Sequence, residues 1–369
     1  MSGGVDSSVA AALLVEQGYE VIGMMMRLWS ETGSGPATPA NRCCTPDQMA
    51  DARRVATHLG IPFYVIDVRQ HFRQAIVQFF LDEHDAGRTP NPCVECNRQI
   101  RFTYLLERAL AMDADFLATG HYARIDRGSE GYRLRQGLDS HKDQSYVLHT
   151  LRQDQLARVL FPIGELTKDE VRRIAQDRGL AVASKQESQD LCFLNDGDYR
   201  RFIRDHSLHI HQPGPIIDQY GRQLGIHEGL PFYTIGQRKG LGIAAAEPLF
   251  VVGKDLPRNA LIVGGRESLG VTELTTHGVN WIVGTPPLLP IPATVKIRYK
   301  ATPIQATVTP VSINRAHVNF DEPAFGVTPG QAAVFYDGDI CLGGGIILDE
   351  TAGKKYRELV NPSKEEPAG

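Results

Sequence analysis

The first two hundred residues alternate short apolar runs with amphipathic stretches of helical length. The apolar runs predict buried strands, and the stretches between them predict helices on both faces of a parallel sheet. The runs are YEVIGMMM, IPFYVIDV and ADFLATGHYAR, and the helical stretches are TPDQMADARRVATHLG and QHFRQAIVQFFLDEHDAG. A further helix is expected in LTKDEVRRIAQDRGL, where Thr167 and Glu170 have capping-box spacing and Gly179 ends the helix. The pattern predicts an α/β, Rossmann-like domain over residues 1–205.

The pattern changes after residue 205. Residues 206–272 contain more Pro and Gly and shorter segments, as in PFYTIGQRKGLGI, which predicts a small middle domain. Residues 273–361 alternate apolar and polar positions in VNWIV, ATVKIRY, IQATVTPV, HVNF and QAAVFY, as is typical of a compact antiparallel β-barrel. Residues 362–369 are polar and predict a flexible tail.

Composition narrows the class of protein. A chain of 369 residues that is 42% hydrophobic can form several domains with separate cores. It contains no apolar run near the roughly 18 residues of a membrane helix and no secretory leader, so we expect a cytoplasmic protein without a membrane partner. The net charge of -4 argues against nonspecific coating of nucleic acid but allows a local basic face. Six cysteines are few for a secreted disulfide scaffold, so thiols, metal ligands or catalytic groups are expected.

The chain opens with MSGGVDSS directly before a helical stretch. Glycines let the backbone approach a ligand closely, and the start of a helix offers unpaired amides and a positive dipole end to an anion. The loop lacks the Walker pattern, which places a lysine beside the γ-phosphate. Ser and Gly also favour ordinary helix caps, so the residues alone leave both a phosphate cradle and a simple cap open.

Two cysteines, Cys93 and Cys96, lie in TPNPCVECN, and a third, Cys192, lies in the polar stretch SQDLCF. A structural zinc site would need a second CxxC pair or a His pair nearby, and none follows. The neighbouring Pro and Asn residues fit an exposed rigid loop better than a buried turn. The sequence therefore indicates that these cysteines lie in loops and take part in chemistry there, and it leaves open whether they act as nucleophiles or in another role.

The opening loop resembles the SGGxDS loop of the ATP pyrophosphatase (PP-loop) superfamily, and the whole chain resembles its bacterial tRNA-specific 2-thiouridylases. The motifs that carry this resemblance are SGGVDSSVAA, GRTPNPCVECNRQIRF, ATGHYAR, GLDSHKDQSYVLHTL, FPIGELTKDEVR, SQDLCF, GQRKGLGI and VTPGQAAVFYDGDICLGGGII. The resemblance implies a tRNA-uridine 2-sulfurtransferase that uses ATP and Mg²⁺. Such an enzyme adenylates the C2 oxygen of the wobble uridine in Glu, Gln and Lys tRNAs and replaces it with sulfur, releasing AMP and pyrophosphate.

The resemblance also implies roles for individual residues. Cys192 would carry a persulfide, Cys96 would be the nucleophile, and the two would close a transient disulfide. Asp6 would lie near Mg²⁺ or hold the loop. The implied ATP contacts are Met1, Ser2, Gly3, Gly4, Val5, Asp6, Ser7, Ser8, Met26 and Gly120. The implied contacts with the target base, the tRNA or the active-site loop are Asn91, Pro92, Cys93, His121, Lys142, Asp143, Gln144, Arg298, Tyr299 and Gln331. The sulfur donor would be a cysteine desulfurase or a small sulfur-carrier protein.

Cys93 departs from the best-known members, which have an aspartate there. A thiol with an ordinary pKa near 8.5 is a poorer proton shuttle at neutral pH, so the role of this position is open. Cys93, Cys96 and Cys192 could instead ligate three irons of a [4Fe-4S] cluster whose fourth iron binds hydrosulfide. Another PP-loop ligase, acting on an amino substrate, is a further alternative, but it would not need paired distant cysteines.

Three further expectations concern the start of the chain and the remaining cysteines. The family carries a strand before the PP loop, so we expect the true start to lie upstream of Met1. Cys43 and Cys44 are expected to be structural residues at a helix start. Cys341 is expected to be a packed thiol of the barrel.

Overall fold

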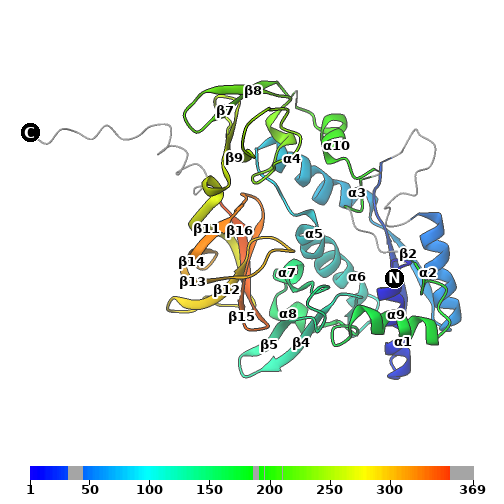
Figure 1. The fold of residues 1–369 in the computed structure, drawn as a ribbon. Helices are drawn as coiled ribbons and strands as arrows, with labels where there is room; N and C mark the ends of the chain where they lie inside the picture. The colour runs from blue at the N-terminus through cyan, green and yellow to red at the C-terminus, as the bar shows by residue number, and fades with distance from the viewer. Residues whose placement is uncertain (32–44, 186–190, 195, 210, 350–369) are drawn as a thin grey trace, which may run out of the picture.

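The computed structural model describes residues 1–31, 45–185, 191–194, 196–209 and 211–349. Cys43, Cys44 and the expected tail at 362–369 lie outside these ranges. In Figure 1 the α/β domain lies to the right, the middle domain at the top and the barrel to the left. Within the described ranges, no helix is long and apolar enough to cross a membrane.

The α/β domain confirms the predicted fold class, with its parallel strands arranged as two pairs, β1 with β2 and β3 with β6, among the described residues. Its strands are β1 (Gly23–Arg27), β2 (Phe63–Asp67), β3 (Leu117–Ala118) and β6 (Val159–Leu160). Its helices are α1 (Val5–Glu16), α2 (Pro46–His58), α3 (Arg69–Phe72), η1 (Arg73–Gln78), α4 (Phe79–Asp85), α5 (Pro92–Glu95), η2 (Cys96–Leu105), α6 (Leu106–Leu110), α7 (Ser145–Leu148), α8 (Gln153–Leu156), α9 (Lys168–Asp177) and α10 (Tyr199–His206).

Helix α9 begins where the capping signal predicts. The Thr167 hydroxyl accepts the Glu170 backbone N–H at 3.3 Å, and the Glu170 carboxylate accepts the Thr167 N–H at 2.7 Å. Gly179 follows the helix with a φ of +62°, which favours glycine. Apolar residues of α9, Val171 and Ala175, pack with α1 in one buried cluster. This packing places the first turn of α9 beside the opening loop.

The middle domain is a four-stranded sheet in the order β8-β7-β10-β9. Its elements are β7 (Gly214–Asp218), β8 (Gln223–His227), η3 (Leu230–Phe232), β9 (Phe250–Asp255), β10 (Ala260–Gly264) and η4 (Arg266–Leu269). Its apolar residues Ile216, Phe232 and Val251 belong to the same buried cluster as Phe80 and Phe202 of the α/β domain. The two domains therefore share one hydrophobic core.

The C-terminal barrel closes because β11 pairs with both β14 and β16. Around the ring the order is β11-β14-β13-β12-β15-β16, with antiparallel pairing throughout, as predicted for this part of the chain. Its strands are β11 (Gly270–Trp281), β12 (Ile291–Lys296), β13 (Ile304–Ser312), β14 (Arg315–Phe325), β15 (Ala332–Asp337) and β16 (Ile340–Ile347). Cys341 on β16 is a buried thiol as expected, but it packs in the apolar cluster that the barrel shares with the α/β domain, and burial raises the pKa of its thiol to about 12.

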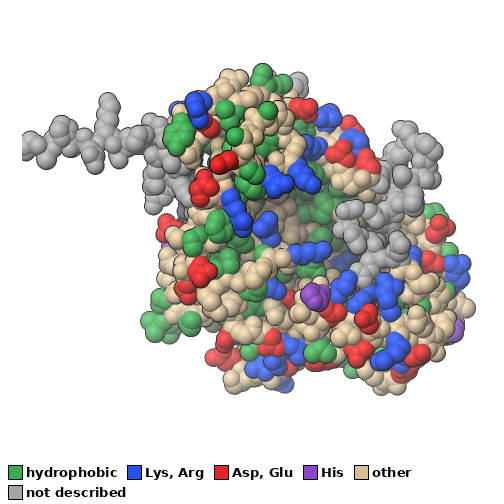
Figure 2. All heavy atoms as spheres, viewed as in Figure 1, with side chains coloured by type: hydrophobic (Ala, Val, Ile, Leu, Met, Phe, Trp, Pro, Cys, Tyr) green, Lys and Arg blue, Asp and Glu red, His purple; other side chains and the backbone are tan. Residues whose placement is uncertain are grey.

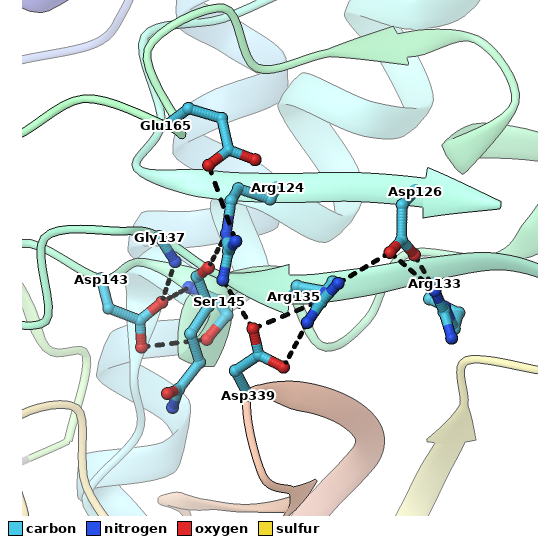
Figure 3. A network of polar contacts seen from close by, with 10 residues as sticks. Arg124, Asp126, Arg133, Arg135, Gly137, Asp143, Ser145, Glu165 and Asp339 are labelled. Atoms are coloured by element: carbon cyan, nitrogen blue, oxygen red, sulfur yellow. Dashed lines mark hydrogen bonds and ion pairs between the residues drawn. The ribbon is translucent and has the colours of Figure 1, made fainter. Parts of the chain in front are cut away.

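A hairpin of the α/β domain, β4 (Ala123–Gly128) with β5 (Gly131–Gln136), extends the barrel sheet because β5 pairs with β16. Figure 3 shows the polar contacts of this joint: Arg135 donates to Asp339 at 2.8 Å and to Asp126 at 2.9 Å. The prediction that ADFLATGHYAR (residues 114–124) forms one parallel strand holds only for Leu117 and Ala118. Only β3 is parallel, and the last two residues of the stretch begin β4, which pairs antiparallel with β5, the next strand along the chain.

Candidate active site

Residues 2–4 form a tight turn, and residues 5–8 form the first turn of α1; together they are the opening loop of the sequence motif. The Ser7 hydroxyl accepts the Ser2 N–H at 3.1 Å, and the Ser8 hydroxyl donates to the Gly4 carbonyl at 2.9 Å. Gly3 has a φ of +71°, and a Cβ there would lie 2.4 Å from the Gln48 carbonyl oxygen. Position 3 therefore requires glycine on two counts. The loop presents the start of a twelve-residue helix, where backbone amides and the helix dipole favour an anion.

Three of the expected ATP contacts outside the loop can be located. Gly120 lies directly against the loop, since a Cβ there would be 2.7 Å from the Ser7 nitrogen. The Met1 amino group donates to the Met24 carbonyl on β1. Met26, further along β1, is partly buried against two apolar clusters. The structure thus brings Met1 and Gly120 to the loop and places Met26 on the neighbouring strand.

Asp6 of the loop is held by two side chains. Lys168 Nζ lies 2.7 Å and 2.9 Å from its two carboxylate oxygens, and the Tyr122 hydroxyl donates to Oδ1 at 2.8 Å. The Lys168 residue is only 8% exposed, so this ammonium is fixed in place. These contacts are what is expected of an Asp6 that holds the loop, one of the two roles implied by the resemblance.

A second ammonium, that of Lys185, reaches the same loop. Its Nζ donates to the Gly3 carbonyl at 2.9 Å and pairs with Asp51 at 2.6 Å. Sequence reasoning missed Lys168 and Lys185. Lys168 lies within FPIGELTKDEVR, a stretch that predicts a capped helix and carries part of the family resemblance but gives no sign that its lysine reaches the opening loop. The fold brings two ammonium groups, each paired with a carboxylate, to an opening loop that contains no lysine of its own.

The cysteine loop, residues 89–96, is ordered by a helix cap. Asn91 Oδ1 accepts the N–H groups of Cys93 at 3.1 Å and Val94 at 3.3 Å, and Pro92 occupies the first position of α5. Cys93 is exposed, whereas Cys96 is buried where α5 passes into the π-helix η2. π-helical turns within helices are frequent at functional sites.

Cys96 and Cys192 meet the same apolar cluster. Cys96 is one of its buried members, and the partly buried Cys192 packs against it beside Phe193. Chain folding therefore brings the two cysteines that the resemblance pairs to one region, and leaves Cys93 on the outside of the loop. Across the described ranges, which include all three thiols, no group of three or more His, Cys, Asp or Glu side chains is arranged to hold a metal ion. The three cysteines do not fit a cluster site in this arrangement.

His121 is buried beside Phe102 and Phe161. Its Nδ1 lies 2.7 Å from the Thr119 hydroxyl and its Nε2 lies 3.2 Å from Arg101. Because a guanidinium only donates, Nε2 accepts and Nδ1 carries the hydrogen. Burial, together with the Arg101 charge, holds the pKa of His121 well below its usual value. His121 is therefore a neutral, fixed hydrogen-bonding group.

The loop that follows β5 is held by Asp143 and Gln144. Asp143 is buried, and its carboxylate accepts the N–H groups of Gly137 at 3.2 Å and Ser145 at 3.0 Å (Figure 3). It also pairs with Lys296 of the barrel at 3.1 Å. The Gln144 side chain accepts the Tyr122 N–H at 3.0 Å. Both residues therefore order this loop, and the half-buried Lys142 precedes them.

The barrel residues expected at the tRNA have different surroundings. Arg298 is exposed, and the half-buried Tyr299 ring lies 6.1 Å from the Tyr146 ring. The Gln331 amide instead reaches the α/β domain, as described below. Figure 2 shows Lys and Arg side chains gathered around a hollow on this face of the molecule. The protein therefore has a local basic surface although its net charge is negative.

The fold and the loop define a class: an α/β protein with a phosphate-binding loop, followed by a small β domain and a closed β-barrel. Family models agree with this order. They match a tRNA methyl transferase HUP domain at residues 1–196, a tRNA methyl transferase PRC-barrel domain at 200–265 and an aminomethyltransferase β-barrel domain at 271–347.

Curated relatives identify the family. The chain is 52% identical over 350 residues to the tRNA-specific 2-thiouridylase MnmA of Magnetococcus marinus, covering 94% of this chain and 97% of the relative. Proteins of the same name from Roseiflexus castenholzii and Geotalea uraniireducens are 48% and 51% identical, again over 94% of this chain and over 97% and 93% of their own. The chain belongs to the family of tRNA-specific 2-thiouridylases. A solved NMN synthetase from Francisella tularensis is 17% identical with a TM-score of 0.27 over 50% of this chain and 63% of its own, too distant to inform the site.

Proposed function

We propose that this protein is an ATP-dependent tRNA 2-thiouridylase that replaces the C2 oxygen of the wobble uridine in Glu, Gln and Lys tRNAs with sulfur. The observation that carries the proposal is the pairing of two features in one domain. A phosphate loop backed by Lys168 and Lys185 lies in the same domain as Cys96 and Cys192, which share an apolar cluster. Family membership gives this combination its substrate class.

The first half-reaction makes the oxygen a leaving group. A carbonyl oxygen departs poorly, so attack of the uridine O2 on the α-phosphate of ATP would form an adenylated uridine and release pyrophosphate. The loop amides at the start of α1 would hold the nucleotide phosphates, and Lys168 and Lys185 would offset part of their charge. Mg²⁺ would bind with the nucleotide and neutralise further phosphate charge. The contacts of Asp6 with Lys168 support a loop-holding role for that carboxylate.

The second half-reaction delivers sulfur. The terminal sulfur of a Cys192 persulfide would attack C2, forming the C2–S bond while the C2–O bond breaks and AMP leaves. The Cys96 thiolate would then attack the inner sulfur of Cys192, forming the Cys96–Cys192 disulfide and leaving the sulfur on the base. A dithiol reductant would restore both thiols, and a cysteine desulfurase or small sulfur carrier would reload Cys192. The largely apolar surroundings of both cysteines would limit competition from water.

The substrate base must leave its stack, because C2 is inaccessible within a stacked anticodon loop. Asn91 and Pro92, at the start of the cysteine loop, would bracket the flipped uridine, with the exposed Cys93 beside it. The basic hollow would bind the phosphates, and Arg298 with Tyr299 would supply an ionic contact and a ring surface.

Alternative functions receive less support. A [4Fe-4S] mechanism would need Cys93, Cys96 and Cys192 to converge, and they lack a metal-binding arrangement in the described ranges. An amide-forming PP-loop ligase leaves the shared surroundings of Cys96 and Cys192 without a role. The family models carry methyl transferase in their descriptions, but the curated relatives are named 2-thiouridylases.

Pyrophosphate release tests the proposal. Purified protein would be mixed with ATP, Mg²⁺ and unmodified tRNA, with and without a persulfide donor. We expect pyrophosphate release that requires a tRNA with a wobble uridine, and 2-thiouridine in the digested tRNA only when sulfur is supplied. Release that is equally fast without tRNA, or thiolation without ATP, would overturn the proposed function.

A further inference from the structure

The segment that leads to the cysteines is attached to the barrel by Gln331. The Gln331 Nε2 donates to the Thr89 carbonyl at 2.8 Å and lies 3.3 Å from the Pro90 carbonyl. The Thr89 N–H donates in turn to the Pro329 carbonyl at 2.9 Å. Three contacts thus connect two consecutive residues of the α/β domain to the turn before β15.

The backbone of this turn approaches the cysteine loop closely. Gly330 has a φ of +90°, and a Cβ there would lie 3.0 Å from the Thr89 nitrogen. Gln331 is itself fixed in the barrel, because the Ile347 N–H donates to its carbonyl at 2.8 Å. The amide is therefore presented from a rigid strand pairing and not from a mobile loop.

The attachment lies directly before the reactive segment. Asn91, whose side chain caps α5, follows Pro90, and α5 leads within one turn to Cys96. A shift of Pro90 would move the cap and change the direction from which Cys96 meets Cys192. The Thr89 hydroxyl also lies 3.4 Å from the Thr234 hydroxyl of the middle domain, so all three domains meet at this residue.

We propose that Gln331 is a positioning residue, which holds the cysteine loop through Thr89 and Pro90 so that Cys96 is in place to react. The resemblance implies a tRNA contact for this side chain, but its amide N–H groups point to the protein's own loop. The inference rests on the proposed function only in taking Cys96 as the reacting thiol. In this role of Gln331, the barrel helps to position the reacting cysteine, in addition to the RNA contacts proposed for its surface.

The test separates the two roles by measuring the loop without RNA. Gln331→Ala removes both donors, and Gln331→Glu keeps the shape while presenting a carboxylate that cannot donate to the two carbonyls. Gln305→Ala, an exposed glutamine of β13, is the matched control. Hydrogen exchange of residues 89–96 and the alkylation rate of Cys96 would be followed by mass spectrometry, with tRNA absent.

We expect both Gln331 variants to raise exchange in residues 89–96 and to change Cys96 alkylation about tenfold, while Gln305→Ala stays at wild-type rates. In thiolation assays we expect kcat to fall about tenfold and the KM for tRNA to change less than twofold. Loop exchange and alkylation at wild-type rates in both variants would overturn the inference, as would a change confined to the KM. Failure of the wild-type protein to thiolate tRNA would instead overturn the proposed function, since the RNA-free measurements do not depend on it.

Discussion

The ion pair between Lys296 and Asp143 joins the barrel to the loop after β5, and Lys296→Met should destabilise this joint. The Lys296 Nζ lies 3.1 Å from Asp143 Oδ2, and the two side chains are 12% and 2% exposed. The low exposure of Asp143 matters most, because its carboxylate cannot regain water unless the loop opens. Methionine keeps much of the length of lysine and its packing near the Tyr336 ring, so the loss is mainly that of the charge.

The expected magnitude follows from the contacts. At 3.1 Å the attraction is about 5 kcal/mol for an effective dielectric of about 20, and the desolvation of both ions opposes it. Removing one partner of a buried pair typically costs about 3–5 kcal/mol, because the other charge stays buried. Asp143 keeps the N–H groups of Gly137 and Ser145 and the Ser145 hydroxyl as donors. We therefore expect the lower end, about 3 kcal/mol.

Urea unfolding followed by circular dichroism would measure this loss, with the exposed Lys300→Met as the control, expected to stay within about 0.5 kcal/mol of wild type. Adding Asp143→Asn to the Lys296→Met variant should recover about 1–2 kcal/mol, because the buried charge disappears while an acceptor oxygen remains. A double variant less stable than Lys296→Met, or a Lys296→Met variant as stable as wild type, would show that the ion pair does not stabilise this joint.

Further predictions concern the nucleotide loop and pH. Gly120→Ala adds a methyl group 2.7 Å from a loop backbone atom, so the KM for ATP in pyrophosphate release should rise more than about tenfold; an unchanged KM would contradict the close approach. Lys168→Met leaves the Asp6 charge unpaired beside the phosphates, so ATP affinity should fall about tenfold while tRNA affinity holds, and Lys168→Arg should be milder. Burial lowers the pKa of His84 to about 3 and of His149 to about 4. Below pH 6.5 these two histidines take up protons in the unfolded chain but stay neutral in the folded chain. Lowering the pH from 7.5 to 5 should therefore reduce the free energy of unfolding by about 2 kcal/mol for each histidine. Equal urea midpoints at both pH values would argue against this.

Local signals predicted much of the fold. The capping box of Thr167 and Glu170 places the start of α9, because a cap depends on residues three positions apart. Alternating apolar and polar positions after residue 273 predicted barrel strands, because alternation is likewise a property of neighbouring residues. The pattern did not show that the β4–β5 hairpin belongs to the barrel sheet. The strand that pairs with β5 is β16, where Cys341 lies opposite Leu134, and β16 comes from the far end of the chain. A periodicity describes which face of a strand is buried and does not name the neighbouring strand.

The residues of the candidate site also fall into two groups, those that local sequence predicts and those that only tertiary folding brings together. The role of the glycines in the opening loop could be predicted without knowing their neighbours in space, since the backbone freedom of glycine is a local property. Lys168 could not, because its partner Asp6 lies in the first helix of the chain and only tertiary folding brings them together. Asp143 and Gln331 were expected at the tRNA, whereas their side chains make contacts within the protein. Sequence resemblance identifies such positions without distinguishing a contact with substrate from a contact that orders a loop.

A single turnover with protein that carries a persulfide on Cys192 tests the proposed sulfur relay most directly. Loaded protein would be mixed with ATP, Mg²⁺ and unmodified tRNA without reductant, and both products would be quantified by mass spectrometry. We expect one 2-thiouridine for each Cys96–Cys192 disulfide, and no turnover by Cys192→Ser. Cys96→Ser should form no disulfide and should not release thiolated tRNA. Full 2-thiouridine formation by either variant, or by wild type without disulfide formation, would contradict the proposed relay.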